Sequence, residues 1–254
     1  MATPAYESRD WGGHGGPPLQ RLHYGWGEAA NLAELDRQLD YWDTEGTRKP
    51  FAHPLNLQRV AEWLSHDSRI LDFGCGYGRC LGELSNAGYR NLIGFDFSPA
   101  MIAAACARFP AITFQELQSS NIPLPDSSID GALLFSVLTC IPTDDGQQTL
   151  IAELHRVLRP GGLLYISDLW LQHDDRNLSR YARDEAKYGT YGVFDLPEGV
   201  TVRHHDPKWI QTLTSDFETV ALDHIEVVTM NGNPAQAFQW FGVKPNIGTN
   251  IPAV

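Results

Sequence analysis

Two acidic residues and a glycine-rich segment have a spacing that suits the binding of a ribose-containing ligand. The segment Asp72 to Gly78 carries glycine at every second position from Gly74, and such glycines permit positive φ and let a ligand lie close to the backbone. A second acid, Asp96, follows 24 residues after Asp72, an offset at which a carboxylate binds the hydroxyls of a ribose. The loop and the two acids together therefore predict a nucleoside-binding site.

The hydrophobic pattern around these residues predicts the elements that position them. Segments with helical spacing of apolar residues alternate with short apolar runs, which is typical of an α/β fold with helices on both faces of a sheet. Ser98 and Pro99 predict the start of one helix, as its N-cap and first helical residue. We expect a doubly wound, mainly parallel, seven-stranded sheet with strands near 69–73, 91–96, 112–115, 131–136, 163–167, 217–229 and 237–243.

Two additions to this sheet are expected. Residues 1–20 are polar and rich in glycine and proline, and the segment 29–44 has the apolar spacing of an amphipathic helix. We therefore expect residues 1–50 to form a flexible tail and a helical cap or lid, and residues 51–254 to form the binding domain. Within that domain, a polar stretch over 170–205 interrupts the alternation and is interpreted as an insertion after the fifth strand.

Composition excludes several classes of protein. The formal net charge of −12 argues against a protein whose main partner is the phosphate backbone of nucleic acid. No apolar run reaches the length that spans a bilayer, and the start of the chain does not resemble a secretory signal. The four cysteines lack the spacing of a metal site. We expect a cytoplasmic monomer or homodimer without metal, whose partner is a small molecule rather than nucleic acid or membrane.

From about Ile70 to Trp170 the sequence resembles the class I (Rossmann-like) S-adenosylmethionine (SAM) dependent methyltransferases, of the small-molecule type. A nicotinamide or flavin site is disfavoured, because the loop has the spacing G-x-G-x-G and because Asp72 would repel a pyrophosphate but hold an ammonium group. Gln118 stands where this family usually has an acid that meets the adenine amine. The resemblance implies SAM as cofactor, with binding residues Asp72, Gly74, Cys75, Gly76, Asp96, Phe97, Gln118, Ser119 and Ser136.

The resemblance further implies transfer of a methyl group to a small metabolite. Because the methyl group of a sulfonium is already activated, the reaction mainly needs an acceptor held in line with it. A neutral imidazole can take a proton from that acceptor, which makes His204 and His205 candidate catalytic residues. Tyr181 of the same insertion is the third candidate. Surface or helix-capping roles also suit the two histidines. The candidate substrate and lid residues are Tyr24, Trp26, Thr139, Tyr188, Tyr191 and Arg203.

Two other functions fit the same pattern. Some methyltransferase-like proteins, such as azetidine-2-carboxylate synthases, make SAM attack itself and release methylthioadenosine. The tyrosine-rich insertion and the absence of a histidine near Thr139, where many related enzymes carry one, keep this cyclase or lyase reaction open. A SAM-binding regulatory protein without chemistry is the further alternative.

Overall fold

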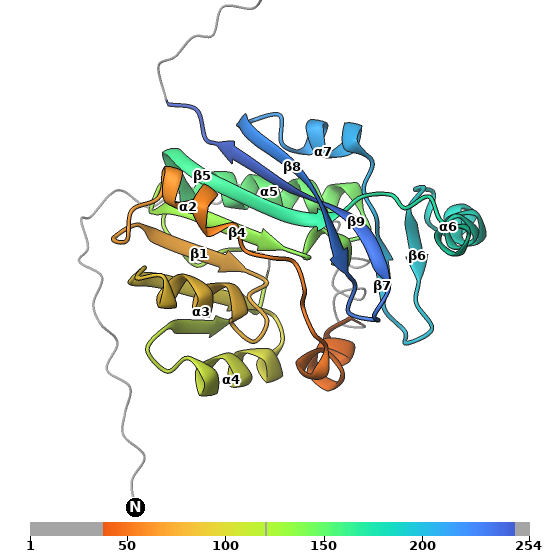
Figure 1. The fold of residues 1–254 in the computed structure, drawn as a ribbon, viewed down its shortest axis with the longest axis horizontal. Helices are drawn as coiled ribbons and strands as arrows, with labels where there is room; N and C mark the ends of the chain where they lie inside the picture. Colours follow the sequence, from red (N-terminus) through yellow and green to blue (C-terminus); the bar gives the residue numbers. More distant parts are fainter. Residues whose placement is uncertain (1–37, 120, 247–254) are drawn as a thin grey trace, which may run out of the picture.

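A single seven-stranded sheet forms the centre of the chain in the computed structural model, which describes residues 38–119 and 121–246 (Figure 1). Five strands run parallel, and β9 and β8 add an antiparallel edge, in the order β3-β2-β1-β4-β5-β9-β8. This is the mainly parallel seven-stranded sheet predicted from the sequence. The strands are β1 (Arg69–Phe73), β2 (Asn91–Asp96), β3 (Thr113–Glu116), β4 (Ile129–Phe135), β5 (Leu158–Leu169), β8 (Glu218–Val228) and β9 (Pro234–Val243).

Helices cover both faces of the sheet, because successive residues of its buried strands point to opposite sides. On one face, Leu71 and Leu134 belong to a core cluster with α5 and α7, whereas on the other Ile70 and Leu133 pack with α2 and α3. Ser98 caps α4 by accepting a hydrogen bond from Met101 N, as predicted. The helices are α2 (Leu57–Trp63), α3 (Arg79–Asn86), α4 (Pro99–Arg108), α5 (Asp144–Val157), α6 (Asp175–Tyr188) and α7 (Pro207–Leu213).

The stretch interpreted as an insertion has a fold of its own. It contains α6 and a two-stranded antiparallel sheet of β6 (Val193–Asp195) and β7 (Thr201–Arg203), which lies beside α6 at the edge of the molecule (Figure 1). Tyr181, Phe194 and Val202 form an apolar cluster here with Tyr41, which comes from a helix over residues 38–44. The N-terminal part of the predicted cap, with Tyr24 and Trp26, lies outside the described residues.

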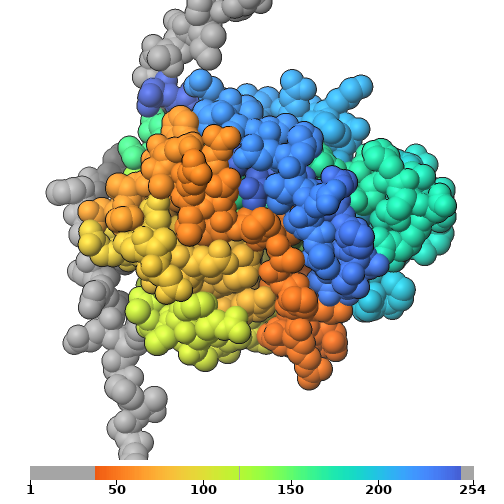
Figure 2. Space-filling view, in the orientation of Figure 1, coloured from red at the N-terminus to blue at the C-terminus, as the bar shows by residue number. Residues whose placement is uncertain are grey.

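A segment without regular secondary structure, residues 49–56, crosses the front of the sheet, and we call it the strap. Figure 2 shows it among the orange residues, between the yellow residues of the first half of the domain and the blue residues of β8 and β9. Its backbone is held on both sides, because Arg79 Nη2 donates to His53 O at 2.6 Å and Gln239 Nε2 donates to Pro54 O at 2.6 Å. The strap is therefore fixed in place. It follows the short helical turns of residues 38–48, including η1 (Gly46–Arg48).

The part of the chain that the structure describes contains no helix long and apolar enough to cross a bilayer.

Candidate active site

The glycine loop connects β1 to α3 at the carboxyl edge of the sheet. Gly74, Gly76 and Gly78 have φ of 70°, 52° and 79°, values at which other residues are strained. The amide of Gly74 donates to Phe95 O at 2.8 Å, so the loop is tied to β2. A Cβ atom on Gly74 would lie 2.4 Å from Val137 Cγ2. Both the backbone conformation and the neighbouring side chain therefore require glycine at this position.

Asp96 ends β2 and braces this loop. Its Oδ2 accepts a hydrogen bond from Gly76 N at 2.8 Å, and its Oδ1 accepts from Ser98 N at 2.9 Å. Burial raises the pKa of Asp96, and the hydrogen bonds from the backbone amides oppose that rise. Each carboxylate oxygen still has acceptor capacity, so Asp96 suits a ligand with neighbouring hydroxyl groups.

Asp72 is the second acid of the site, and its surroundings differ from those of Asp96. Its side chain is buried in β1, and its Oδ1 has no hydrogen-bond partner among the described residues. Burial raises the pKa of Asp72 to about 8, while the nearby Arg79 lowers it and the nearby Asp96 raises it. A buried carboxyl with an unused oxygen fits a ligand that brings a positive charge and a hydrogen-bond donor, as the ammonium of SAM does.

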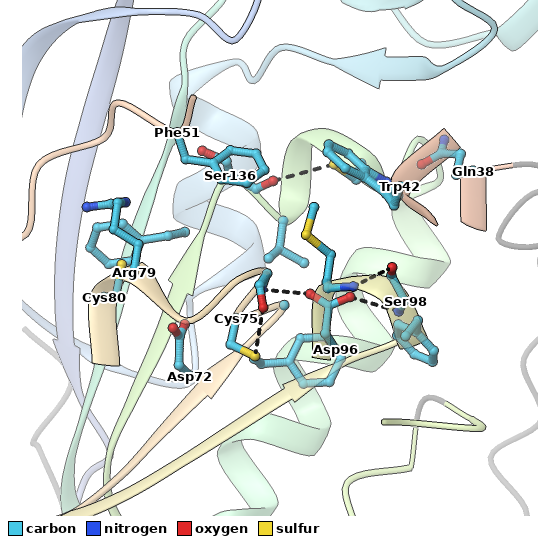
Figure 3. A pocket seen from close by; sticks show the side chains of 18 of the residues that line it. Gln38, Trp42, Phe51, Asp72, Cys75, Arg79, Cys80, Asp96, Ser98 and Ser136 are labelled. Carbon is cyan, nitrogen blue, oxygen red and sulfur yellow. Dashed lines mark hydrogen bonds between the residues drawn. The ribbon is translucent and has the colours of Figure 1, made fainter. Parts of the chain in front are cut away.

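The loop and both acids line one pocket (Figure 3). Figure 3 shows Phe51 of the strap and Trp42 facing the loop across this pocket. The predicted cofactor residues that line it are Asp72, Gly74, Cys75, Gly76, Asp96, Phe97 and Ser136. Gln118 and Ser119 do not line it: both are exposed, and the Gln118 amide donates to the Glu116 carboxylate instead. The fold therefore brings seven of the nine predicted cofactor residues around one cavity.

A second pocket adjoins the first. Trp42, Phe51, Ser136 and Cys140 line both pockets, so the two cavities meet at these four side chains. Ser136 has a φ of 55°, a conformation that is uncommon for residues other than glycine and that often occurs at functional sites. Beyond this junction, the second pocket extends between the strap, α6, the β6–β7 hairpin and the turn from β8 to β9.

His53 of the strap lines the second pocket and was not singled out from the sequence. It is buried, and its Nδ1 lies 2.8 Å from Ser167 Oγ. Burial lowers the pKa of His53 to about 4, and the nearby Arg79 also lowers it, so the ring is neutral at neutral pH. When Nδ1 donates to Ser167, Nε2 is the acceptor nitrogen of the ring. The geometry thus supplies a neutral base, which no local motif around His53 indicates.

Among the predicted catalytic residues, His204 lines the second pocket. Tyr181 does not line it but contacts the ring of His204. The Tyr181 hydroxyl accepts a hydrogen bond from Gln172 N at 3.0 Å and lies 2.5 Å from His204 Nδ1. Donor and acceptor in this contact depend on the tautomer of His204: when Tyr181 donates to Nδ1, the ring proton is on Nε2. Burial, followed by the nearby Arg180 and Arg176, lowers the pKa of His204 to about 3, so the ring is neutral near neutral pH.

The third predicted catalytic residue, His205, lines neither pocket. It is completely buried, with Nδ1 3.1 Å from Leu169 O and Nε2 3.1 Å from Gln147 Nε2. Both ring nitrogens are therefore used in contacts within the protein. The structure gives His205 a place in the core between β5 and α5, and no access to a ligand.

Of the four predicted substrate and lid residues that the structure describes, one lines a pocket and three do not. Thr139 lines the second pocket. Arg203, Tyr188 and Tyr191 line neither pocket. Arg203 donates to Pro142 O and pairs with an aspartate of α5, the Tyr188 hydroxyl donates to an aspartate of β6, and Tyr191 is exposed. Arg203 thus joins the insertion to the start of α5, Tyr188 joins two elements within the insertion, and Tyr191 faces solvent.

The described residues contain no group of three or more histidine, cysteine, aspartate or glutamate side chains arranged to hold a metal ion.

Known proteins resemble the chain in the same region. A family model described as a methyltransferase domain matches residues 70–162. A probable SAM-dependent methyltransferase of Mycolicibacterium smegmatis is 34% identical over 45% of this chain and 43% of its own length. An O-methyltransferase of Aspergillus nomiae is 30% identical over 52% of this chain and 61% of its own length. The chain thus spans about half of the length of the curated relatives it matches.

Solved structures extend the similarity to most of the fold. The crystal structure of a SAM-dependent methyltransferase from Methanosarcina mazei superimposes with a TM-score of 0.69 and 27% identity, over 74% of this chain and 97% of that one. The methyltransferase-domain match includes the glycine loop between β1 and α3. The solved structure is similar over the same fold. Residues 70–162 thus match a methyltransferase domain, and the chain is similar to class I SAM-dependent methyltransferases, whose cofactor is SAM.

Proposed function

We propose that this protein transfers a methyl group from SAM to a small molecule that binds in the second pocket. The observation that carries the proposal is the junction at Trp42, Phe51, Ser136 and Cys140, where a pocket with cofactor-binding features adjoins a pocket with its own polar side chains. Methyl transfer needs a donor site and an acceptor site in contact, since the reaction depends on holding the two reactants in line.

The residues of the first pocket suit the parts of SAM. Asp72 would hold the ammonium group, and Asp96 would accept hydrogen bonds from the ribose hydroxyls. Trp42 and Phe51 offer aromatic faces, which attract a positively charged sulfonium. When bound, SAM supplies a methyl group that is already activated for transfer to a nucleophile. The helix over residues 38–44 carries Gln38, Leu39 and Trp42 to this pocket, which supports a role of residues 1–50 as its lid.

His53 would act as the base for the acceptor. Its Nε2 would take the proton of an acceptor hydroxyl, while Ser167 holds the opposite ring nitrogen and Arg79 holds the backbone carbonyl. A base is useful only where the nucleophile must lose a proton, as a hydroxyl does on methylation. The O-methyltransferase name of the Aspergillus nomiae relative supports oxygen as the acceptor atom.

The experiment that tests the proposal compares what the purified protein makes from SAM with and without acceptor. Incubation with SAM alone, followed by mass spectrometry, should leave SAM intact, and addition of metabolite extracts should release S-adenosylhomocysteine together with a methylated compound. Formation of methylthioadenosine without any acceptor would overturn the proposal and assign the cyclase or lyase reaction. Tight binding of SAM without any product from broad acceptor pools would instead assign a regulatory protein.

A further inference from the structure

The second pocket has an excess of positive charge at the wall formed by the insertion. Arg176 and Arg180 come from the first turns of α6, and Glu198, from the loop between β6 and β7, is the only acidic side chain among the described residues that line the pocket. The two histidines of the pocket, His53 and His204, are neutral. The side chains that line the pocket therefore carry one net positive charge near neutral pH, and Asp174, which does not line it, forms an ion pair with Arg176 at 3.6 Å.

The hydrogen-bonding groups of these arginines are not used up within the protein. Arg176 Nε is buried and makes no hydrogen bond, since the nearest carboxylate oxygen, Asp174 Oδ1, lies 3.6 Å away. Arg180 donates one hydrogen bond, from Nη1 to Asn177 Oδ1 at 3.3 Å, and its guanidinium lies over the ring of Phe194. A guanidinium has five N–H donors, so both arginines keep donors for a ligand.

Arg176 and Arg180 are like charges, and Arg176 lowers the pKa of Arg180. The pKa of Arg180 is lowered by burial and by the nearby Arg176 and Arg183, while Asp174 and Glu198 raise it. Asp174 and Glu198 offset part of the repulsion between the two cations, and the pKa of Arg180 is still lowered. A bound anion would remove this repulsion and would satisfy the unused donor of Arg176.

We propose that the methyl acceptor is a small carboxylic acid, whose carboxylate binds to Arg176 and Arg180. The inference rests on the proposed function and adds the class of the substrate. Arginine binds carboxylates through paired, charge-assisted hydrogen bonds. In the tautomer in which Tyr181 donates to Nδ1, His204 Nε2–H offers a third donor in the same pocket. The single net charge of the walls matches a carboxylate better than a doubly charged phosphate.

The bound carboxylate is a handle and is not the group that becomes methylated. The side chains that line both pockets, Trp42, Phe51, Ser136 and Cys140, come from the helix over 38–44, the strap and the segment after β4. Among the described residues, those of α6 line only the second pocket. An acid held by α6 would therefore extend its other end toward His53 and the cofactor pocket.

The experiment measures binding of matched acids and amides to the full chain saturated with S-adenosylhomocysteine. The probes are a panel of hydroxybenzoates and aliphatic hydroxy acids, the corresponding neutral amides, and inorganic phosphate, with binding followed by ligand-observed NMR. We expect members of the acid panel to bind and their amides to bind at least about tenfold more weakly, since a charge-assisted hydrogen bond is lost. The same acids should release S-adenosylhomocysteine when SAM replaces it.

Three variants should change the affinity for the acids in different directions. Arg180→Gln should weaken binding of the acids about tenfold or more, with no change for the amides. Glu198→Gln should tighten binding of the acids, because it removes the opposing charge from the pocket. Arg59→Gln is the matched control: it removes the same charge from a partly exposed arginine of α2 that lines neither pocket and pairs with Glu62 and Asp223. This control should bind the acids as the unmodified protein does.

The outcomes separate the inference from the proposed function. If the protein binds SAM but acids and amides bind equally, or no acid binds, or phosphate alone binds, the carboxylate proposal is wrong while methyl transfer stands. Equal binding of the acids by Arg180→Gln and by the unmodified protein would also overturn it. Failure to bind SAM, measured separately by calorimetry, would contradict the proposed function itself.

Discussion

His53 Nδ1 and Ser167 Oγ lie 2.8 Å apart, although 114 residues separate them in the chain. Ser167 is completely buried in β5, and His53 belongs to the strap that crosses the sheet. The contact therefore joins a segment without secondary structure to a central strand. It fixes the orientation of an imidazole beside the second pocket, and burial keeps that imidazole uncharged.

Replacement of His53 should slow methyl transfer and leave SAM binding intact. His53→Gln removes the proposed base, and general-base catalysis contributes about 10²- to 10⁴-fold to a rate. We expect kcat to fall by that factor while the affinity for SAM, measured by calorimetry, stays unchanged, because His53 does not line the cofactor pocket. The control His173→Gln changes an exposed histidine that lines neither pocket and should keep full activity.

The acid limb of the pH profile should report the same imidazole. A base works in its deprotonated form, so activity falls as the pH drops through its pKa, which burial lowers to about 4 for His53. We expect kcat, measured with SAM and acceptor both saturating so that the titration of Asp72 does not contribute, to stay level from about pH 7 down to about pH 5, where an ordinary histidine would already be protonated. A limb centred near about pH 6.5 in short assays on folded protein would contradict this assignment.

SAM binding should release a proton from Asp72. In the free protein its pKa is about 8, so the carboxyl is mainly protonated near neutral pH, whereas a bound ammonium favours the carboxylate. The affinity should therefore rise from about pH 6 to about pH 8. Calorimetry in buffers of different ionisation enthalpy measures the released proton.

Two variants distinguish Asp72 from Asp96 in this experiment. Asp72→Asn should abolish the proton release, whereas Asp96→Asn should weaken SAM binding at every pH and keep the release, because Asp96 is held by the amides of Gly76 and Ser98. The expected loss for Asp96→Asn is about 1.5 to 3 kcal/mol, as for a hydrogen bond to a charged group. Equal proton release in the unmodified protein and Asp72→Asn would refute the role of Asp72.

Asp168 should make the fold less stable as the pH rises. It is completely buried in β5, where it accepts hydrogen bonds from Thr139 N and Leu169 N, and burial raises its pKa to about 7. A folded-state pKa above the unfolded value of 3.8 gives stability that is present at low pH and is lost as the pH rises through about 7.

Asp168→Asn removes this titration and tests the sign of the effect. The variant loses one acceptor at every pH, so it should be less stable than the unmodified protein near pH 5. The difference in unfolding free energy should narrow by about pH 8, because only the unmodified protein then buries a charge. Urea denaturation at the two pH values measures the difference, and a constant gap would show that Asp168 has an ordinary pKa.

Gly74→Ala should disturb both stability and cofactor binding. Its φ of 70° strains an alanine by about 1 to 2 kcal/mol, and its Cβ would lie 2.4 Å from Val137, which lines the cofactor pocket. Gly189→Ala is the matched control, with a φ of 67° and no atom within 4 Å of the added Cβ. Both variants should lose stability in thermal unfolding, and only Gly74→Ala should bind SAM more weakly.

The sequence alone predicted the sheet, and it singled out most of the residues that line the pocket proposed for the cofactor. Alternating apolar periods predict the parallel strands, because a buried strand and an amphipathic helix each leave a local record in the chain. Asp72, Asp96 and the glycines are read in the same way, since a turn with positive φ and an acid at a strand end are local requirements. Asp72, Asp96, Gly74 and Gly76 line one pocket.

Only the tertiary structure decided which side chains face the second pocket. His53, Arg176 and Arg180 stand in the strap and α6, segments whose local pattern says nothing about the cavity that they reach. Of the adjacent pair His204 and His205, the first lines the pocket and the second is used in the core. The two histidines follow the end of β7, and their side chains have different surroundings. Packing between segments that are distant in the chain determines which of them reaches the pocket, and such packing leaves no local signal in the sequence.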